Sequence, residues 1–134
     1  MKVSEFMTKK IECINADASI YDAIERLLDK RIRSLVVKNA NSHKPDGVIT
    51  ARDIVFKVLS EGKDPRRIKV GEIASFPVVC VSPDDEISKA MRLMKEMNYA
   101  RVFVCEGNCV IGVLALMDVM QASLVEKARA GNHA

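Results

Sequence analysis

An internal repeat is the feature of this sequence that most limits its fold. Residues 47–53 read GVITARD, and residues 112–118 read GVLALMD, so Gly, Val and a closing Asp return 65 positions later. Upstream the two halves match at an offset of 67, as in CINADASIYDAI at 13–24 and CVSPDDEISKAM at 80–91. Self-similarity at a fixed period indicates one structural unit present twice. We therefore predict two small, similar units.

Each copy has the pattern of a β-α-β-β-α unit. A short strand is predicted at 11–14 and again at 78–81, followed by acidic helix-start signals and an apolar stripe at helical spacing from Ile20 and from Ile87. Two strands then follow, at 34–38 with 47–50 and at 101–105 with 109–115. A second helix is predicted to start near Thr50 and near Ala115.

Composition indicates a globular protein without a nucleic-acid signature. Of the 134 residues, 49% are hydrophobic and 29% charged, and the net charge is +3, which is too small to imply nucleic acid. The N-terminus has no apolar signal region, and the longest apolar run, at 109–120, is broken by Asp118. We expect a cytoplasmic protein with no membrane partner.

No catalytic or metal-binding constellation is visible. The four cysteines have no CxxC spacing, and neither His43 nor His133 has a nearby nucleophile or cysteine pair. We interpret the cysteines as small buried hydrophobes. An alternative for Cys105 and Cys109 is a disulfide across the turn that they flank. There is no Walker-type lysine loop and no metal-binding carboxylate pair, so we do not expect an enzyme.

The turn from Gly47 to Asp53 carries the candidate chemistry. A strand that leads into a helix at Thr50 presents unpaired backbone N–H groups and the positive end of the helix dipole, which suit a phosphate. The Thr50 hydroxyl adds a donor, and Asp53 offers two acceptor oxygens to the vicinal hydroxyls of a ribose. Gly47, without a side chain, would let a ring approach the strand.

The same residues permit a structural interpretation. Thr-x-x-Asp is also a capping-box pattern, which stabilises a helix N-terminus without any ligand. In the second copy Ala115 has no hydroxyl, yet Asp118 remains. Because the acid is kept where the hydroxyl of the N-cap residue is missing, the sequence favours a role for the acid other than capping. An acid near a helix start is, however, favourable without any such role. Both interpretations stay open.

The order of elements resembles the cystathionine-β-synthase (CBS) domain family in its tandem arrangement, the Bateman module. So does the Gly-x-x-Thr-x-x-Asp phrase, which is complete at Gly47, Thr50 and Asp53 and partial at Gly112 and Asp118. The resemblance runs from Val3 to about Met120. It implies a mixed α/β (α+β) fold of two β-α-β-β-α repeats related by a pseudo-twofold. We place the first repeat at 1–62, a linker at 63–69, the second repeat at 70–127 and a polar tail at 128–134.

The resemblance also implies two clefts, each joining the motif turn of one repeat to the first two strands of the other. The first cleft would use Thr50 and Asp53 with Val48, Arg52, Val78, Val79, Tyr99 and Arg101. The second would use Asp118 with Glu12, Ile32 and Arg33. We expect the second cleft to bind weakly, because Ala115 offers no hydroxyl and Glu12 adds a carboxylate beside a phosphate or base.

The favoured function is a non-enzymatic sensor of an adenine nucleotide (AMP, ADP or ATP) that needs no cofactor and acts through an unknown effector protein. S-adenosylmethionine is another ligand that such a module accommodates. A different class is a nucleic-acid or protein adaptor that uses the basic linker, whose cations are Lys63, Arg66, Arg67 and Lys69. Nucleic acid is the less favoured partner, because acidic residues lie beside these cations.

We also expect a homodimer. Two helices in each copy carry more apolar surface than a small sheet can cover, so a second copy is the simplest cover. The family resemblance agrees, since such modules commonly pair. The residues on which this expectation rests are Ile24, Leu28, Ile54, Val55, Met91, Met94 and Val119.

Overall fold

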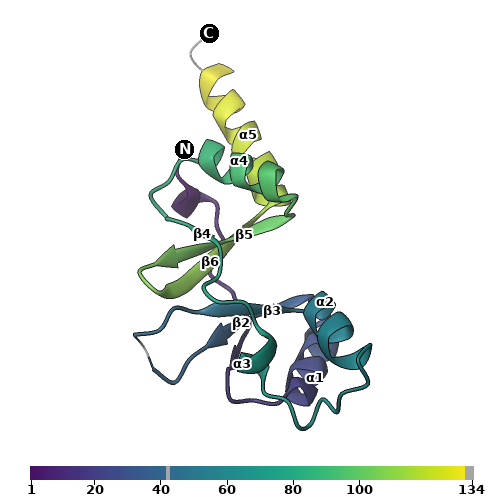
Figure 1. The fold of residues 1–134 in the computed structure, drawn as a ribbon. Coiled ribbons are helices and arrows are strands. Elements are labelled where there is room, and N and C mark those ends of the chain that lie inside the picture. The colour runs from purple at the N-terminus through teal and green to yellow at the C-terminus, as the bar shows by residue number, and fades with distance from the viewer. Residues whose placement is uncertain (42, 132–134) are drawn as a thin grey trace. The chain divides into compact units, whose positions relative to one another are not determined.

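The computed structural model describes residues 1–41 and 43–131 (Figure 1), so His133 and the end of the predicted polar tail lie outside the described residues. The chain forms two compact units. The first-repeat unit is Glu12–Val78, and the second-repeat unit combines Met1–Ile11 with Val79–Ala134. The predicted mixed α+β class with a β-α-β-β-α order in each unit is confirmed.

The first-repeat unit is built on the sheet β1-β2-β3. Its strand β1 (Cys13–Asn15) runs parallel to β2 (Ser34–Lys38), and β2 runs antiparallel to β3 (Gly47–Thr50). Helix α1 (Ile20–Lys30) connects the first two strands. After β3 come α2 (Ala51–Ile54), the π-helical turn η2 (Val55–Leu59) and the short α3 (Val70–Ile73).

The second-repeat unit repeats this plan with the sheet β4-β5-β6. A 3₁₀ turn, η1 (Val3–Glu5), precedes it in the chain. Strand β4 (Cys80–Val81) is parallel to β5 (Arg101–Glu106), which is antiparallel to β6 (Cys109–Ala115). Helix α4 (Ile87–Met97) lies between β4 and β5 in the chain, and α5 (Leu116–Gly131) follows β6.

Each unit buries part of the predicted apolar stripe of its first helix against one face of its own sheet, while Leu28 and Met91 of these stripes are exposed. Ile20, Ala23 and Leu27 of α1 belong to one buried cluster with Leu35 and Ile49. The counterparts Ile87, Ala90 and Met94 of α4 belong to a second cluster with Val102 and Leu114. Met94 therefore serves as core filler, as predicted, whereas the prediction is wrong for Met91, which is exposed. At about 25 cal/mol per Å² of apolar surface, such burial is the main stabilising contribution.

The compact units do not coincide with the sequence repeats, because the opening segment of each repeat packs with the body of the other. The Val3 N–H donates to the Asp85 carbonyl at 2.9 Å in the second-repeat unit. In the first-repeat unit the Val70 N–H donates to the Ala18 carbonyl at 2.8 Å. The repeat limits given above describe the sequence and stay a prediction, whereas the compact bodies exchange these segments.

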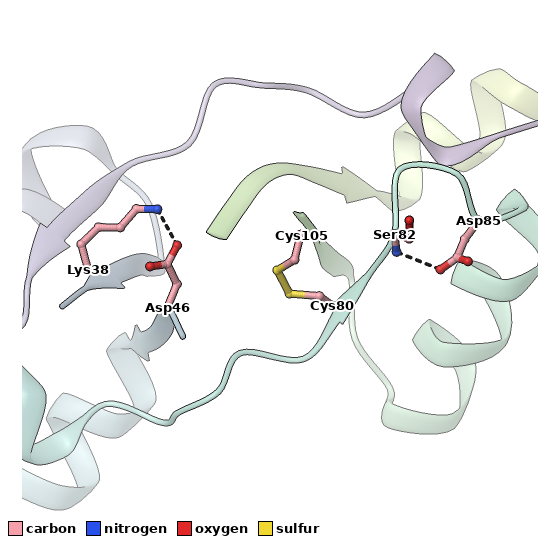
Figure 2. Close-up of a disulfide and its surroundings, with 6 residues drawn as sticks. All are labelled: Lys38, Asp46, Cys80, Ser82, Asp85 and Cys105. Atoms are coloured by element: carbon pink, nitrogen blue, oxygen red, sulfur yellow. Dashed lines mark hydrogen bonds and ion pairs between the residues drawn. A yellow bond between two sulfur atoms is a disulfide. The ribbon is translucent and has the colours of Figure 1, made fainter. Parts of the chain in front are cut away.

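Cys105 forms its disulfide with Cys80 (Figure 2), so the alternative Cys105–Cys109 pairing is wrong. In the β5–β6 ladder Cys105 lies opposite Val110, and Cys109 lies opposite Glu106. Because side chains alternate along a strand, the thiols of Cys105 and Cys109 point to opposite faces. Cys80 pairs with Phe103, two residues before Cys105, and therefore shares a face with Cys105.

Among the described residues, no helix is both long enough and apolar enough to cross a bilayer.

Asp85, just before α4, provides a test of these local contacts. The Ser82 N–H donates to its carboxylate at 2.8 Å (Figure 2), and Lys89 forms an ion pair with it at 3.3 Å. The hydrogen bond from Ser82, and then Lys89, hold the pKa of Asp85 below its ordinary value of 3.8. Folding therefore favours the ionised carboxylate, and the stability that it adds is complete above the ordinary pKa and lost as the pH falls through the folded-state pKa.

We predict that Asp85→Asn lowers the melting temperature at pH 7 and that the difference from wild type shrinks as the pH falls below 3.8. Asparagine keeps an acceptor oxygen for Ser82, so the difference isolates the charge. Asp84→Asn is the matched control, because the Asp84 side chain is 84% exposed. A difference that stays constant over the acid range would contradict the assignment.

Candidate functional site

The turn at Thr50 forms a complete capping box. The Asp53 N–H donates to the Thr50 hydroxyl oxygen at 3.1 Å, and the Thr50 N–H donates to the Asp53 Oδ2 at 3.1 Å. The other carboxylate oxygen, Oδ1, forms an ion pair with Lys57 at 3.3 Å. The helical residues after Thr50 run without a break from Ala51 to Leu59. The interpretation of this motif as a capping box is therefore confirmed. A ligand at this turn would have to share the Asp53 carboxylate with the Thr50 N–H and with Lys57.

The second turn explains why the acid persists after the hydroxyl is lost. The Ala115 N–H donates to the Asp118 Oδ2 at 2.7 Å, which is the same bond that Asp53 makes to Thr50. Loss of the hydroxyl removes only one of the two reciprocal capping bonds. The persistence of Asp118 therefore needs no ligand, and it no longer favours a separate use for the acid.

The two motif glycines have a structural role that we did not predict. Ser75 and Val48 exchange backbone hydrogen bonds of 2.9 and 3.0 Å beside Gly47, and Thr8 and Val113 exchange two of 2.9 Å beside Gly112. A Cβ on Gly47 would lie 2.6 Å from the Ser75 carbonyl oxygen and 2.5 Å from the Phe76 ring. A Cβ on Gly112 would lie 2.7 Å from the Thr8 carbonyl oxygen. The space beside Gly47 is therefore occupied by Ser75 and Phe76 of the same chain. The expectation that it would admit the ring of a ligand is wrong.

The predicted residues of the first cleft divide between the two compact units. Those in the first-repeat unit are Val48, Thr50, Arg52, Asp53 and Val78. Those in the second-repeat unit are Val79, Tyr99 and Arg101, and all three are exposed. The structure describes each unit separately, so the meeting of these residues around one ligand stays a prediction.

Within each unit, strand pairing places a basic residue next to the motif turn. Arg101 lies opposite Ala115 in the β5–β6 register. In the first-repeat unit the Arg33 carbonyl accepts the Ala51 N–H at 2.8 Å. Both arginines are exposed. An exposed cation therefore lies beside each turn in its own unit, namely Arg101 on β5 and Arg33, the residue just before β2.

Other predicted residues have structural partners in their own unit. The Arg52 guanidinium lies 5.0 Å from the centroid of the Phe56 ring, one turn further along the helix. The Val78 N–H donates to the Asp46 carbonyl at 3.0 Å. Of the second-cleft residues, Glu12 gives its carbonyl to Val36, and Ile32 packs on the first hydrophobic core.

The basic linker is held to its own unit. The Arg66 guanidinium stacks on the Tyr21 ring at 4.6 Å, and Arg67 and Lys69 face Asp64 and Asp17 at 3.8 and 4.0 Å. Such surface pairs are weak, but they place an acid or a ring beside three of the four cations. This arrangement favours a solvated connecting segment over a nucleic-acid contact.

Sequence reasoning missed two contacts at or near the candidate site residues. They are the Asp53–Lys57 ion pair and the Cys80–Cys105 disulfide. The ion pair could have been predicted from the sequence, because an acid and a lysine four residues apart on a helix lie on the same face. The second required the parallel pairing of β4 with β5, which no local pattern shows. In the part of the chain that the structure describes, no group of three or more His, Cys, Asp or Glu residues is arranged to hold a metal ion.

Comparison with protein families supports the resemblance seen in the sequence. The model of the CBS domain family matches residues 3–60 and 70–125. An uncharacterized protein of Methanopyrus kandleri is 34% identical over 97 residues, which are 72% of this chain and 49% of that protein. The chain spans about half the length of this relative and also of the mitochondrial CBS domain-containing protein CBSX3 of Arabidopsis thaliana.

Solved structures with the same fold include CBSX2 in complex with AMP. It is 25% identical and has a TM-score of 0.75, with 94% of this chain and 98% of that chain covered. The hexameric CBS-CP12 protein from bloom-forming cyanobacteria is 30% identical and has a TM-score of 0.74, with 90% and 69% covered.

The glycine contacts predict the effect of adding one methyl group. Gly47→Ala and Gly112→Ala should each lower the free energy of unfolding by about 1–3 kcal/mol, because the backbone carbonyl in the way cannot rotate aside as a side chain could. Gly131→Ala in α5 is the control, since nothing lies within 4 Å of its added Cβ. Urea unfolding of the three variants measures this, and unchanged stability at Gly47 and Gly112 would refute the close approach.

Proposed function

The chain belongs to the CBS domain family, and from this premise we propose that it is a non-enzymatic module that binds an adenine nucleotide and reports its presence to a partner. AMP, ADP and ATP are the candidate ligands. The observation that carries the proposal is the AMP complex of CBSX2, a structure that matches nearly the whole chain. The first motif turn adds a hydroxyl and a carboxylate at a helix N-terminus.

The capping contacts leave Asp53 able to bind a ribose. A carboxylate has about four lone-pair sites, and one oxygen accepts the Thr50 N–H while the other faces Lys57. About two sites therefore remain for the vicinal hydroxyls of a ribose. Because these partners also fix the carboxylate in place, little side-chain freedom would be lost on binding.

The remaining contacts of the proposed site follow the family resemblance. Val48, Val78 and Val79 would line the base, and Tyr99 would close its edge. Arg101, which is exposed on β5, and Arg52 would supply positive charge to the phosphate. A shift of Arg52 from the Phe56 ring to a phosphate would exchange a cation–π contact for a charge-assisted hydrogen bond.

The second motif turn supports weaker binding. It lacks the hydroxyl of Thr50, and Glu12 would bring a carboxylate to a site that has to accept phosphate. Ile32 and Arg33 would complete this site. We propose one nucleotide per chain, bound by the set that contains Thr50 and Asp53.

We further propose that two chains associate through their second helices. Apolar side chains remain exposed on η2 and α5, with Met117 and Leu124 both at 72%. Two residues on which the sequence argument relied, Ile54 and Met94, are instead buried in their own units, at 2% and 4%. The exposed apolar side chains of η2 and α5 are Val55, Phe56, Leu59, Leu116, Met117, Met120 and Leu124. A homodimer would cover this set.

Paired substitutions of the two equivalent acids test the nucleotide proposal. Asp53→Ala and Asp118→Ala each remove a carboxylate that accepts a backbone N–H, so both should lose stability. Only Asp53→Ala should weaken nucleotide binding, by about tenfold to a hundredfold, since a hydrogen bond to a charged group is worth about 1.5–3 kcal/mol. Titration calorimetry with AMP, ADP and ATP gives the affinities and the stoichiometry.

S-adenosylmethionine and a short DNA duplex belong in the same titrations. Tighter binding of S-adenosylmethionine than of any nucleotide would replace the proposed ligand, and binding of DNA alone would favour the adaptor. A larger loss of affinity from Asp118→Ala than from Asp53→Ala, or a stoichiometry near two per chain, would show that the other turn holds the nucleotide.

Sedimentation tests the proposed association. We expect a species of about twice the 14.9 kDa chain mass at micromolar concentration. Met117→Lys together with Leu124→Lys should yield monomers, because burying two lysines in an apolar contact is costly. Gln121→Lys adds a charge to the same helix without removing an exposed apolar side chain and serves as the control. A wild-type chain that sediments only as a monomer, or as a hexamer like the cyanobacterial CBS-CP12 protein, would contradict the homodimer.

A further inference from the structure

The Cys80–Cys105 disulfide fixes β4, the shortest of the described strands, to its neighbour β5. Strand β4 has only two residues, and its ladder with β5 consists of the pairs Cys80↔Phe103 and Val81↔Val104. The Cα atoms of Cys80 and Cys105 are 5.7 Å apart, within the usual range for a disulfide. A two-residue strand gains little from its own hydrogen bonds, so the covalent link carries much of its attachment.

The attached strand begins where the chain passes from one compact unit to the other. Val78 is the last residue of the first-repeat unit, and Val79 and Cys80 continue in the second-repeat unit. The Val78 N–H is held by the Asp46 carbonyl on one side, and the disulfide holds Cys80 on the other. The two valines between these anchors are residues of the proposed nucleotide site. Val79 therefore lies one residue, and Val78 two residues, from the disulfide.

The first repeat holds the equivalent strand without a disulfide. Cys13 occupies the position of Cys80 at the repeat offset of 67, and Lys38 occupies that of Cys105. Lys38 forms an ion pair with the buried Asp46 (Figure 2), and Cys13 remains a thiol. Strand β1 has three paired residues, and Arg26 donates to the Cys13 carbonyl. Of these two described strands, β4 is thus the one that combines a short ladder with a reducible bond.

The disulfide is accessible from outside. Both disulfide cysteines are half-buried. Half-burial leaves part of each cysteine in contact with solvent, from which an attacking thiolate would come.

We propose that Cys80–Cys105 is a thiol–disulfide switch that sets the affinity of the nucleotide site, an inference that rests on the proposed function. A thiolate of a dithiol attacks one of the two sulfurs, the S–S bond breaks, and a mixed disulfide forms. The second thiol of the reductant then displaces the remaining cysteine. Two electrons and two protons end on Cys80 and Cys105, and the dithiol becomes a disulfide. Reduction releases the start of β4 and disorders the Val78–Val79 edge of the site.

The test compares AMP binding by the oxidised and the reduced full chain. Calorimetry should give at least about fivefold weaker binding after treatment with dithiothreitol, a typical size for coupling between sites. Reoxidation should restore the affinity. Alkylation and peptide mass spectrometry establish the redox state of each sample, and amide hydrogen exchange at 78–81 should speed up on reduction.

Matched variants separate the switch from general effects of cysteine replacement. Cys80→Ser and Cys105→Ser should each bind AMP like the reduced chain in both conditions. Cys13→Ser and Cys109→Ser should keep the full redox response, because neither cysteine belongs to the disulfide. Cys13 should also alkylate slowly, since burial raises the pKa of its thiol above the ordinary value.

The possible outcomes distinguish failure of the redox switch from failure of the proposed nucleotide binding. Equal AMP affinity in samples whose redox states differ by mass spectrometry overturns the switch and leaves nucleotide binding intact. Oxidised protein that contains no Cys80–Cys105 peptide overturns the switch in the same way. Absence of AMP, ADP and ATP binding in both forms overturns the proposed function, and the switch with it.

Discussion

Two pairs of backbone hydrogen bonds hold together segments that the sequence places far apart. Ser75 bonds to Val48 in the first-repeat unit, and its repeat counterpart Thr8 bonds to Val113 in the second. These contacts bring the opening segment of each repeat onto the last strand of the other repeat. They require a residue without a side chain at Gly47 and Gly112. Close packing of the backbone is therefore sufficient to explain the glycine of the repeated phrase.

The acid of the phrase has a similar origin. Both Asp53 and Asp118 accept the N–H of the residue three positions earlier, and this bond survives when the hydroxyl of the N-cap residue is lost. A ligand at the first turn would use the acceptor capacity that capping leaves over. Capping and binding are therefore compatible, since the cap orients the same carboxylate that a ribose would need. Thr50, not the acid, is what distinguishes the two turns.

The second strands of the two sheets, β2 and β5, show how the repeats have diverged. Equivalent positions hold a lysine, with its ion pair to a buried acid, in one unit and a disulfide in the other. An ion pair around a buried carboxylate depends on both partners being charged, because an unpaired buried charge is costly. A disulfide depends on the redox state of the surroundings. The corresponding attachments of the two units therefore differ in kind, because one is an ion pair and the other a covalent bond.

The sequence by itself determined the repeat, the β-α-β-β-α order, the strands at 34–38 and 47–50, and the apolar stripes of the first helices. These features are local, since period and capping signals act within a few residues. Tertiary structure alone decided that Thr8 and Ser75 cross to the opposite repeat, that Cys80 faces Cys105, and that Ile54 is a core residue. Each of these outcomes depends on which strands pair and on which face a side chain emerges. Contacts between distant segments set both, and no local pattern encodes them.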